Sequence, residues 1–304
     1  MAAKSLAFST LRGTCRMLPG SVYGRLHARG IDRMYRALRD DQYYSIRHAG
    51  GRFWLPATDS SLNRDLLLRG SYEPEAVAAF LAALEQGMSV FDIGANIGYY
   101  TAVAATSVGP AGRVYAFEPD PRNVEVLRRN SAQPRGAPIT VVAAAVGGRE
   151  GKTSLFVNPA DSSINSLARA NADVLGPRDV ARPLTVPSLT LDMFVRREGA
   201  RQPDVIKIDV QGAEMLVLAG AHEVLSHRPL KIFFEFWPFG LQQLGTPPVE
   251  LLEFFIGKGF TLRHLGRGQE VPLRTAADAA SFVQRWNPDI EHARTWHANF
   301  LAFN

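Results

Sequence analysis

A rhythm of short apolar runs and helical stretches, which begins near Met88, is the feature that most constrains the fold of this chain. Runs rich in β-branched and aromatic residues predict strands at residues 89–93, 113–117, 139–146, 204–208, 230–236, 260–265 and 299–303. Helical stretches are predicted at residues 99–107, 121–130, 212–226 and 249–257. Strands separated by helices of about 10–15 residues indicate βαβ units, whose strands pair in parallel. The sequence therefore predicts an α/β fold with a mostly parallel, seven-stranded sheet.

The segment before this rhythm predicts a separate extension. Residues 31–40 are typical of the end of a helix. The apolar runs 43–46 and 53–55 lie on either side of two glycines, which predicts a short hairpin. We therefore expect residues 1–70 to form a basic N-terminal extension with a helical segment and a hairpin.

The remaining residues, 71–304, are predicted to form one domain. A helix over residues 73–86 has Pro74 near its start and a glycine just after its end. Turn residues interrupt the rhythm between residues 147 and 190, which predicts an insertion with some β content. Insertions at the carboxyl edge of a sheet often carry substrate contacts, although this one could equally be a plain surface excursion.

The net charge of +5 is unevenly distributed. Residues 1–40 contain eight Lys or Arg and two Asp, so the rest of the chain carries a net charge of −1. Because residues 41–304 carry no excess positive charge, nucleic-acid binding by this part of the chain is disfavoured. The basic segment is suited either to a solvated helix face or to peripheral contact with an anionic membrane or polyanion. Its Arg-rich start also resembles a mitochondrial transit peptide.

Composition restricts the class of protein further. Hydrophobic residues make up 46% and charged residues 21%, which predicts a packed globular core. Cys15 is the single cysteine, so an internal disulfide is excluded and a reducing compartment fits; we expect a cytoplasmic protein. The longest apolar stretches fall short of the roughly 18–20 residues that a membrane-spanning helix needs.

A glycine-containing loop follows the first strand of the rhythm. Asp92, Gly94 and Gly98 have the spacing G-x-x-x-G rather than the G-x-G-x-x-G of dinucleotide sites. Glycine is needed where the backbone turns tightly or approaches a ligand. Glu118 ends the second strand, 20 residues after Gly98, where an acid can accept from both ribose hydroxyls. This combination favours S-adenosylmethionine, which has no phosphate and whose ammonium group Asp92 could bind.

The residues at these positions resemble a known family. Asp92–Gly98 (DIGANIG) and Phe117–Pro119 are similar to motifs of class I methyltransferases. Val205–Glu214 (VIKIDVQGAE) resembles the KIDVEGAE signature of the FkbM-type methyltransferases. Gly70–Pro74 is similar to that family's G.YEP lead-in.

The resemblance extends over roughly residues 65–304, with a departure at Gln211, where the family usually has Glu. It implies a Rossmann-like class I methyltransferase fold and an S-adenosylmethionine-dependent methyltransferase that usually acts on oxygen. The implied partner is a small-molecule or glycan acceptor, with hydroxyls of sugars, glycans or secondary metabolites as substrates. Two other interpretations stay open: a catalytically silent cofactor-binding module and, despite the missing G-x-G-x-x-G, an NAD-dependent oxidoreductase.

Four charged residues are candidates for the chemistry: Lys207, Asp209, Glu214 and Glu235. Asp209 ends a predicted strand at the edge that faces ligands in open α/β sheets, so it could act as a general base or orient the acceptor. Glu214 could instead interact with a helix dipole. Lys207 lies in an apolar strand and is expected to pair with an acid, for which Asp209, Glu214 and Glu235 are the choices.

The predicted cofactor-binding residues are Asp92, Gly94, Asn96, Gly98, Tyr99, Glu118, Pro119 and Asp209. Mg²⁺ would fit if Asp209, Glu214 and Glu235 converged, because it prefers oxygen ligands, but no residue is assigned to a metal. The histidines show no zinc-ligand spacing. Residues 1–40 are expected to be unnecessary for cofactor binding.

Overall fold

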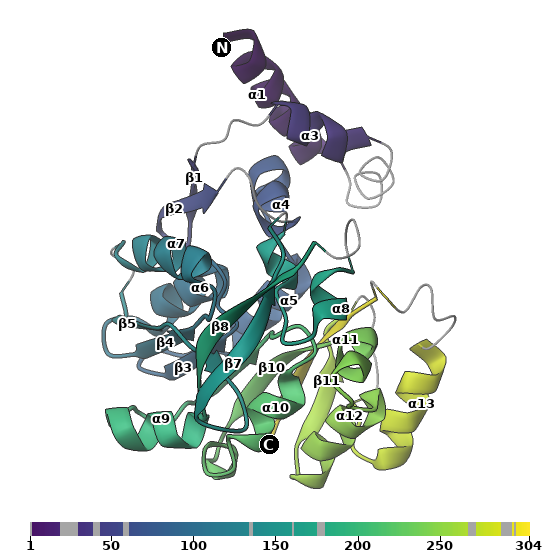
Figure 1. Cartoon of the computed structure of the whole chain (residues 1–304). Helices are drawn as coiled ribbons and strands as arrows, with labels where there is room; N and C mark the ends of the chain where they lie inside the picture. The colour runs from purple at the N-terminus through teal and green to yellow at the C-terminus, as the bar shows by residue number, and fades with distance from the viewer. Residues whose placement is uncertain are drawn as a thin grey trace.

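The computed structural model describes residues 2–18, 30–38, 43–56, 61–133, 136–159, 161–174, 180–266, 272–286, 294 and 296–304. Part of the basic segment, including Arg25, Arg29 and Arg39, lies outside the described residues. Figure 1 shows the arrangement of the helices and strands.

A seven-stranded sheet lies at the centre of the molecule, in the order β11-β12-β10-β9-β3-β4-β5 (Figure 1). Its strands are β3 (Ser89–Ile93), β4 (Arg113–Phe117), β5 (Ile139–Val142), β9 (Val205–Ile208), β10 (Lys231–Phe236), β11 (Thr261–His264) and β12 (Ala298–Phe303). β12 is antiparallel to both of its neighbours, whereas the pairs from β10 to β5 are parallel. The predicted α/β fold with a mostly parallel, seven-stranded sheet is confirmed.

Helices cover the sheet. They are α5 (Pro74–Ala83), α6 (Tyr99–Val108), α7 (Pro121–Ser131), α9 (Leu191–Glu198), α10 (Glu214–Ala219), α11 (Pro238–Gln243), α12 (Pro248–Gly257) and α13 (Ala276–Trp286). Neighbouring residues on a strand belong to different apolar clusters. Val90 lies in the cluster that contains residues of α6, and Phe91 lies in the cluster that contains residues of α9. Val205 and Ile206 divide in the same way. This alternation follows from the two-residue repeat of a strand and explains why these strands are apolar throughout.

Two predicted elements are shorter than expected. The predicted strand 139–146 divides, because β6 (Ala145–Val146) leaves the central sheet and pairs with a strand of the insertion. The single helix predicted over residues 212–226 is wrong: α10 ends at Ala219, and a separate turn, η3 (Val224–Ser226), follows. A Cβ at Gly220 would lie 2.2 Å from the carbonyl oxygen of Gly147, so the close approach of another segment accompanies the end of the helix.

The predicted insertion does have β content. β7 (Gly151–Val157) and β8 (Arg182–Leu189) pair antiparallel and form a three-stranded sheet with β6. Between them lie η2 (Ser162–Ile164) and α8 (Arg169–Ala172). The two long strands cross the middle of the view in Figure 1.

The N-terminal segment contains α1 (Ala2–Met17), α3 (Asp32–Leu38), β1 (Tyr43–His48), β2 (Gly51–Pro56) and α4 (Ser61–Arg69). The predicted hairpin is confirmed as the antiparallel pair β1–β2. Phe8, Leu11 and Cys15 of α1 are buried in one apolar cluster with Leu66 of α4 and Ala104 of α6. Described parts of the extension thus share a core with the sheet, and the boundary at residue 70 stays a prediction. Within the described ranges, no helix combines the length and hydropathy that a transmembrane span requires.

Asn130 joins the hairpin to the glycine loop. Its Oδ1 accepts from the backbone N–H of Trp54 at 2.7 Å, and its Nδ2 donates to the carbonyls of Trp54 and Ile97 at 3.1 and 2.8 Å. Arg129 covers the Trp54 ring at 3.6 Å. The buried amide therefore satisfies backbone groups of two segments that are far apart in the sequence.

We expect Asn130→Ala to lower the free energy of unfolding by about 2–4 kcal/mol, because it leaves buried backbone groups without partners. Urea unfolding followed by circular dichroism measures the change. Arg128→Ala on the exposed side of the same helix is the matched control. Equal losses in the two variants would contradict this role.

Candidate active site

A single cleft contains most of the predicted site residues. It lies at the carboxyl edge of the parallel strands and has an empty volume of about 1410 Å³, solvent at its mouth included. The predicted residues that line it are Asp92, Gly94, Asn96, Tyr99, Glu118, Pro119, Lys207, Asp209 and Glu235. Gly98 and Glu214 are the two predicted residues that do not line it.

The glycine loop begins where β3 ends, beside the end of β9. Gly94 has φ +80°, and a Cβ there would lie 1.9 Å from the carbonyl oxygen of Asp209. The sequence-based reason for this glycine, close approach to a ligand, is therefore incomplete, because the neighbouring main chain already fills the space. Gly98 has φ +91° and precedes α6, and a Cβ there would lie 2.7 Å from the Leu127 side chain.

Asp92 is buried beneath this loop with one oxygen free. Its Oδ2 accepts from the Thr101 hydroxyl at 2.5 Å, whereas Oδ1 is buried without a hydrogen-bond partner. Burial raises the pKa of Asp92, and nearby Lys207 opposes that shift. A buried carboxylate oxygen without a donor is costly, so a donor from a ligand would stabilise it.

Glu118 follows β4 and holds the glycine loop. Its Oε2 accepts from the backbone N–H of Asn96 and its Oε1 from that of Asp120, both at 2.9 Å. Burial raises the pKa of Glu118 to about 7, although these hydrogen bonds oppose the shift. Oε1 also accepts from the Asn123 side-chain amide at 3.4 Å, so Oε2 is the oxygen with a further lone pair that can accept from a ligand.

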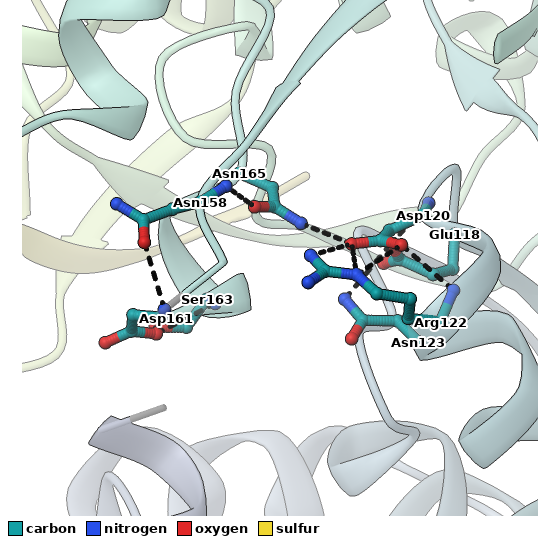
Figure 2. Close-up of polar contacts among 8 residues, drawn as sticks. All are labelled: Glu118, Asp120, Arg122, Asn123, Asn158, Asp161, Ser163 and Asn165. Carbon is teal, nitrogen blue, oxygen red and sulfur yellow. Dashed lines mark hydrogen bonds and ion pairs between the residues drawn. The ribbon is translucent and has the colours of Figure 1, made fainter. Parts of the chain in front are cut away.

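The insertion is connected to this end of the cleft by polar contacts (Figure 2). Asn165 donates to Asp120 Oδ2 at 2.8 Å, and its own Oδ1 accepts from the backbone N–H of Asn158 at 2.8 Å. Arg122 pairs with the same Asp120 oxygen at 2.7 Å. Apolar residues of the insertion and of the sheet complete the wall, among them Phe117, Ala144, Val146, Leu155, Ile164 and Leu167. The sequence did not assign any insertion residue to the site.

At the other end, four polar side chains form one connected group. Lys207 donates to Asp209 Oδ2 at 2.9 Å, as expected for a lysine in an apolar strand. The Gln211 amide donates to Asp209 Oδ1 and to Glu235 Oε2, both at 2.8 Å. Asp209 and Glu235 lie close together because of the strand register. Ile208 of β9 pairs with Phe234 of β10, so the residues that follow them, Asp209 and Glu235, lie opposite each other. Gln211 therefore bridges the two strand-end carboxylates.

The charges in this group affect each other. Burial opposes ionisation of Asp209, but Lys207 and the hydrogen bonds from Lys207 and Gln211 lower its pKa. Burial, together with Asp209, Glu73 and Glu214, raises the pKa of Glu235 well above its ordinary value. Asp209 is thus held ionised, and Glu235 is the carboxylate of the two that holds a proton more readily.

Glu214 does not join the other carboxylates. Its Oε1 accepts from the backbone N–H groups of Val210 and Gly212, at 3.3 and 3.2 Å, at the start of α10. Its carboxylate thus holds the turn before α10, and Asp209, Glu214 and Glu235 do not form one of the groups of described residues that could hold a metal ion. Among the described residues, Glu73, Glu235 and His297 do bring one ligand atom each within 4.8 Å of one another.

The sequence analysis did not predict two residues that lie beside Glu235, namely Glu73 and His297. Glu73 accepts from the Tyr100 hydroxyl at 2.9 Å, and Tyr100 also lies under Lys207, 4.4 Å from the ring centroid. The His297 Nε2 atom lies 3.9 Å from Glu235 Oε1. β12 is antiparallel to β10, so it begins at the carboxyl edge, where the parallel strands end. His297 comes directly before β12, and this position in the sequence could have indicated that it lies at the site.

The cleft fits S-adenosylmethionine. Asp92 offers a free buried oxygen for the ammonium group, Glu118 offers acceptors for the ribose, and the apolar wall suits adenine. These features match the ammonium group, the ribose and the adenine of that cofactor.

Two curated relatives are similar to this chain. The hexuronic acid methyltransferase AglP of Haloferax volcanii is 27% identical over 190 residues, which cover 62% of this chain and 72% of the relative. The 2-O-methyltransferase NoeI of Sinorhizobium fredii is 28% identical over 145 residues, which cover 45% of this chain and 58% of the relative.

A solved methyltransferase FkbM from Methylobacillus flagellatus superposes with a TM-score of 0.40 at 16% identity, covering 99% of this chain and 59% of that chain. The model of the methyltransferase FkbM domain matches residues 92–262, which is more than half of the chain and includes the glycine loop and Asp209. The chain belongs to the FkbM family of S-adenosylmethionine-dependent methyltransferases.

Proposed function

We propose that this protein transfers a methyl group from S-adenosylmethionine to a hydroxyl of a sugar. The observation that carries the proposal is the division of one cleft into two ends. The β4 end offers Glu118 to a cofactor, the β9–β10 end offers Asp209, Glu235 and His297 to an acceptor, and Asp92 on β3 lies between them with an oxygen for the cofactor. A catalytically silent module would have no need for the second end.

The cofactor supplies an electrophilic methyl group on a sulfonium. The residues proposed to hold it are Asp92 at the ammonium group and Glu118 at the ribose, with Asn96, Tyr99 and Pro119 in the surrounding wall. In-line transfer requires the acceptor oxygen to be close and aligned, so the acids at the other end must orient it.

Glu235 is the carboxylate best suited to accept the proton of the acceptor hydroxyl. Its pKa is raised, and its Oε1 faces His297, while Gln211 holds Oε2. Asp209 is a weaker base, because Lys207 and Gln211 lower its pKa. We assign Asp209 and Lys207 to orienting the acceptor and fixing the charge of the group, and Glu235 to general base catalysis.

The acceptor class is proposed from the relatives and from the cleft. One relative is named for a hexuronic acid and the other for 2-O-methylation. The acceptor end of the cleft presents Trp237, an aromatic surface of the kind that packs against sugar rings, and the guanidinium of Arg294, which suits a carboxylate.

The function is tested by incubating the protein with S-adenosylmethionine and a panel of hexuronic acid and hexose glycosides. A gain of one methyl group by mass spectrometry on a hydroxyl of a member of the panel supports the proposal. Binding of S-adenosylmethionine without transfer to any member would favour the silent module. Thermal stabilisation by NADH but not by S-adenosylmethionine would favour the oxidoreductase.

We expect the affinity for S-adenosylhomocysteine to rise about tenfold between pH 6 and pH 8, because Glu118, with a pKa of about 7, accepts ribose hydroxyls best when ionised. Isothermal titration calorimetry measures this slope, which should disappear in Glu118→Gln. Glu214→Gln is the matched control, since Glu214 has the same pKa of about 7 but does not line the cleft. A slope that survives in Glu118→Gln would remove Glu118 from the ribose site.

We expect Glu235→Gln to lower turnover by about a hundredfold or more and to abolish the rise of the rate with pH, as loss of a general base does. Asp209→Asn should keep that rise but shift it to lower pH, because the Asp209 charge raises the pKa of Glu235. Rate–pH profiles with the acceptor found in the panel separate the two. A rise that disappears in Asp209→Asn and persists in Glu235→Gln would exchange the two roles.

Gln211→Glu should shift the same rise to higher pH. The variant places a third negative charge between Asp209 and Glu235, and like charges raise the pKa of a carboxyl group. Gln242→Glu, at an exposed position on α11, adds the same charge away from the cleft and should leave the profile unchanged. An unchanged profile in Gln211→Glu would show that the amide does not govern Glu235.

A further inference from the structure

A second hollow lies between α1, β1 and α4, outside the cleft. It is lined by four arginines, together with Ser45, Ile46 and Gly70; the arginines are Arg12, Arg16, Arg47 and Arg69. We call it the arginine hollow. Its empty volume is about 890 Å³, solvent at its mouth included, and its lining contains no carboxylate among the described residues.

Packing brings these arginines together. Arg12 is anchored by its Nε, which donates to the carbonyl of Leu67 on α4 at 3.1 Å. The guanidinium of Arg16 lies over Gly70, where a Cβ would be 3.7 Å from it. Arg47 extends from the exposed side of β1, and Arg69 ends α4. Two helices and a strand thus contribute arginines to the lining of one hollow.

Like charges lie close together in this hollow. Burial lowers the pKa of Arg12, and the nearby charge of Arg16 lowers it further. Neither Arg16 nor Arg47 forms an ion pair with a carboxylate in the described part of the chain. An anion with several oxygens would offset the repulsion, because guanidinium groups bind phosphate through paired, charge-assisted hydrogen bonds.

We propose that the arginine hollow binds a phosphate-bearing anion. The shared chemistry is a phosphate group with at least two negative charges, held by guanidinium groups from α1 and β1. It could be carried by a soluble phosphate compound or by a lipid headgroup at a membrane surface. The site is independent of methyl transfer, and it gives the basic N-terminal segment a defined ligand.

The test uses the full-length protein, with inorganic pyrophosphate in calorimetry at fixed ionic strength and vesicles of phosphatidylcholine with and without phosphatidic acid in sedimentation. The variant Arg16→Gln/Arg47→Gln removes two exposed arginines of the hollow. The control Arg33→Gln/Arg128→Gln removes the same charge from exposed positions outside it. Affinity for S-adenosylhomocysteine, equal in all three proteins, shows that the cleft is intact.

Pyrophosphate binding that weakens at least about tenfold in the hollow variant, but not in the control, supports the proposal and a soluble source. Binding only to vesicles with phosphatidic acid, lost in the same variant, supports it with a lipid source. Binding to neither probe, or an equal loss in the control, overturns it. If the double variant does not fold, Arg47→Gln alone allows the same comparison.

Discussion

The contact between the ends of β3 and β9 is the constraint on which the site depends. The space that a Cβ of Gly94 would occupy is taken by the main chain of Asp209, whose carbonyl oxygen would be 1.9 Å away. The backbone N–H of Asp209 also donates to the carbonyl of Ile93 at 3.0 Å. Main chain therefore fixes the cofactor loop to the strand that carries the acids. This relation does not depend on side-chain rotamers, which suits a reaction that needs close alignment of two reactants.

A second constraint is the charge of the acceptor end. Carboxylates collected in a buried place repel each other, and each raises the pKa of its neighbours. Lys207 offsets one charge at Asp209, and the neutral amide of Gln211 then donates to Asp209 and Glu235 together. The departure from the family's usual Glu is therefore not a loss. It replaces an acid by a donor and leaves Glu235 as the carboxylate that can exchange a proton.

The sequence predicted best what local patterns determine. β3 and β4 begin and end at the predicted residues, because each is a short apolar run that stops at a loop. An acidic partner for Lys207 was also predicted, with Asp209 as one of three choices, because a lysine in an apolar strand needs a partner. Glu73 and His297 were missed, because a lead-in segment and an antiparallel strand bring them to the edge from positions far away in the sequence. No local pattern encodes such a meeting.

The ribose end shows why some roles need the three-dimensional structure. Strand position alone indicated Glu118 as a ribose acceptor, yet its carboxylate also holds the backbone of Asn96 and Asp120. Asp120 in turn accepts from Asn165 of the insertion. One carboxylate thus connects the ligand, the glycine loop and the cleft wall, so its complete removal would disturb all three. Even a Gln, which keeps the shape and removes the charge, would turn one of these two acceptors into a donor that faces a backbone N–H group, so ribose binding and support of the loop are coupled through this carboxylate.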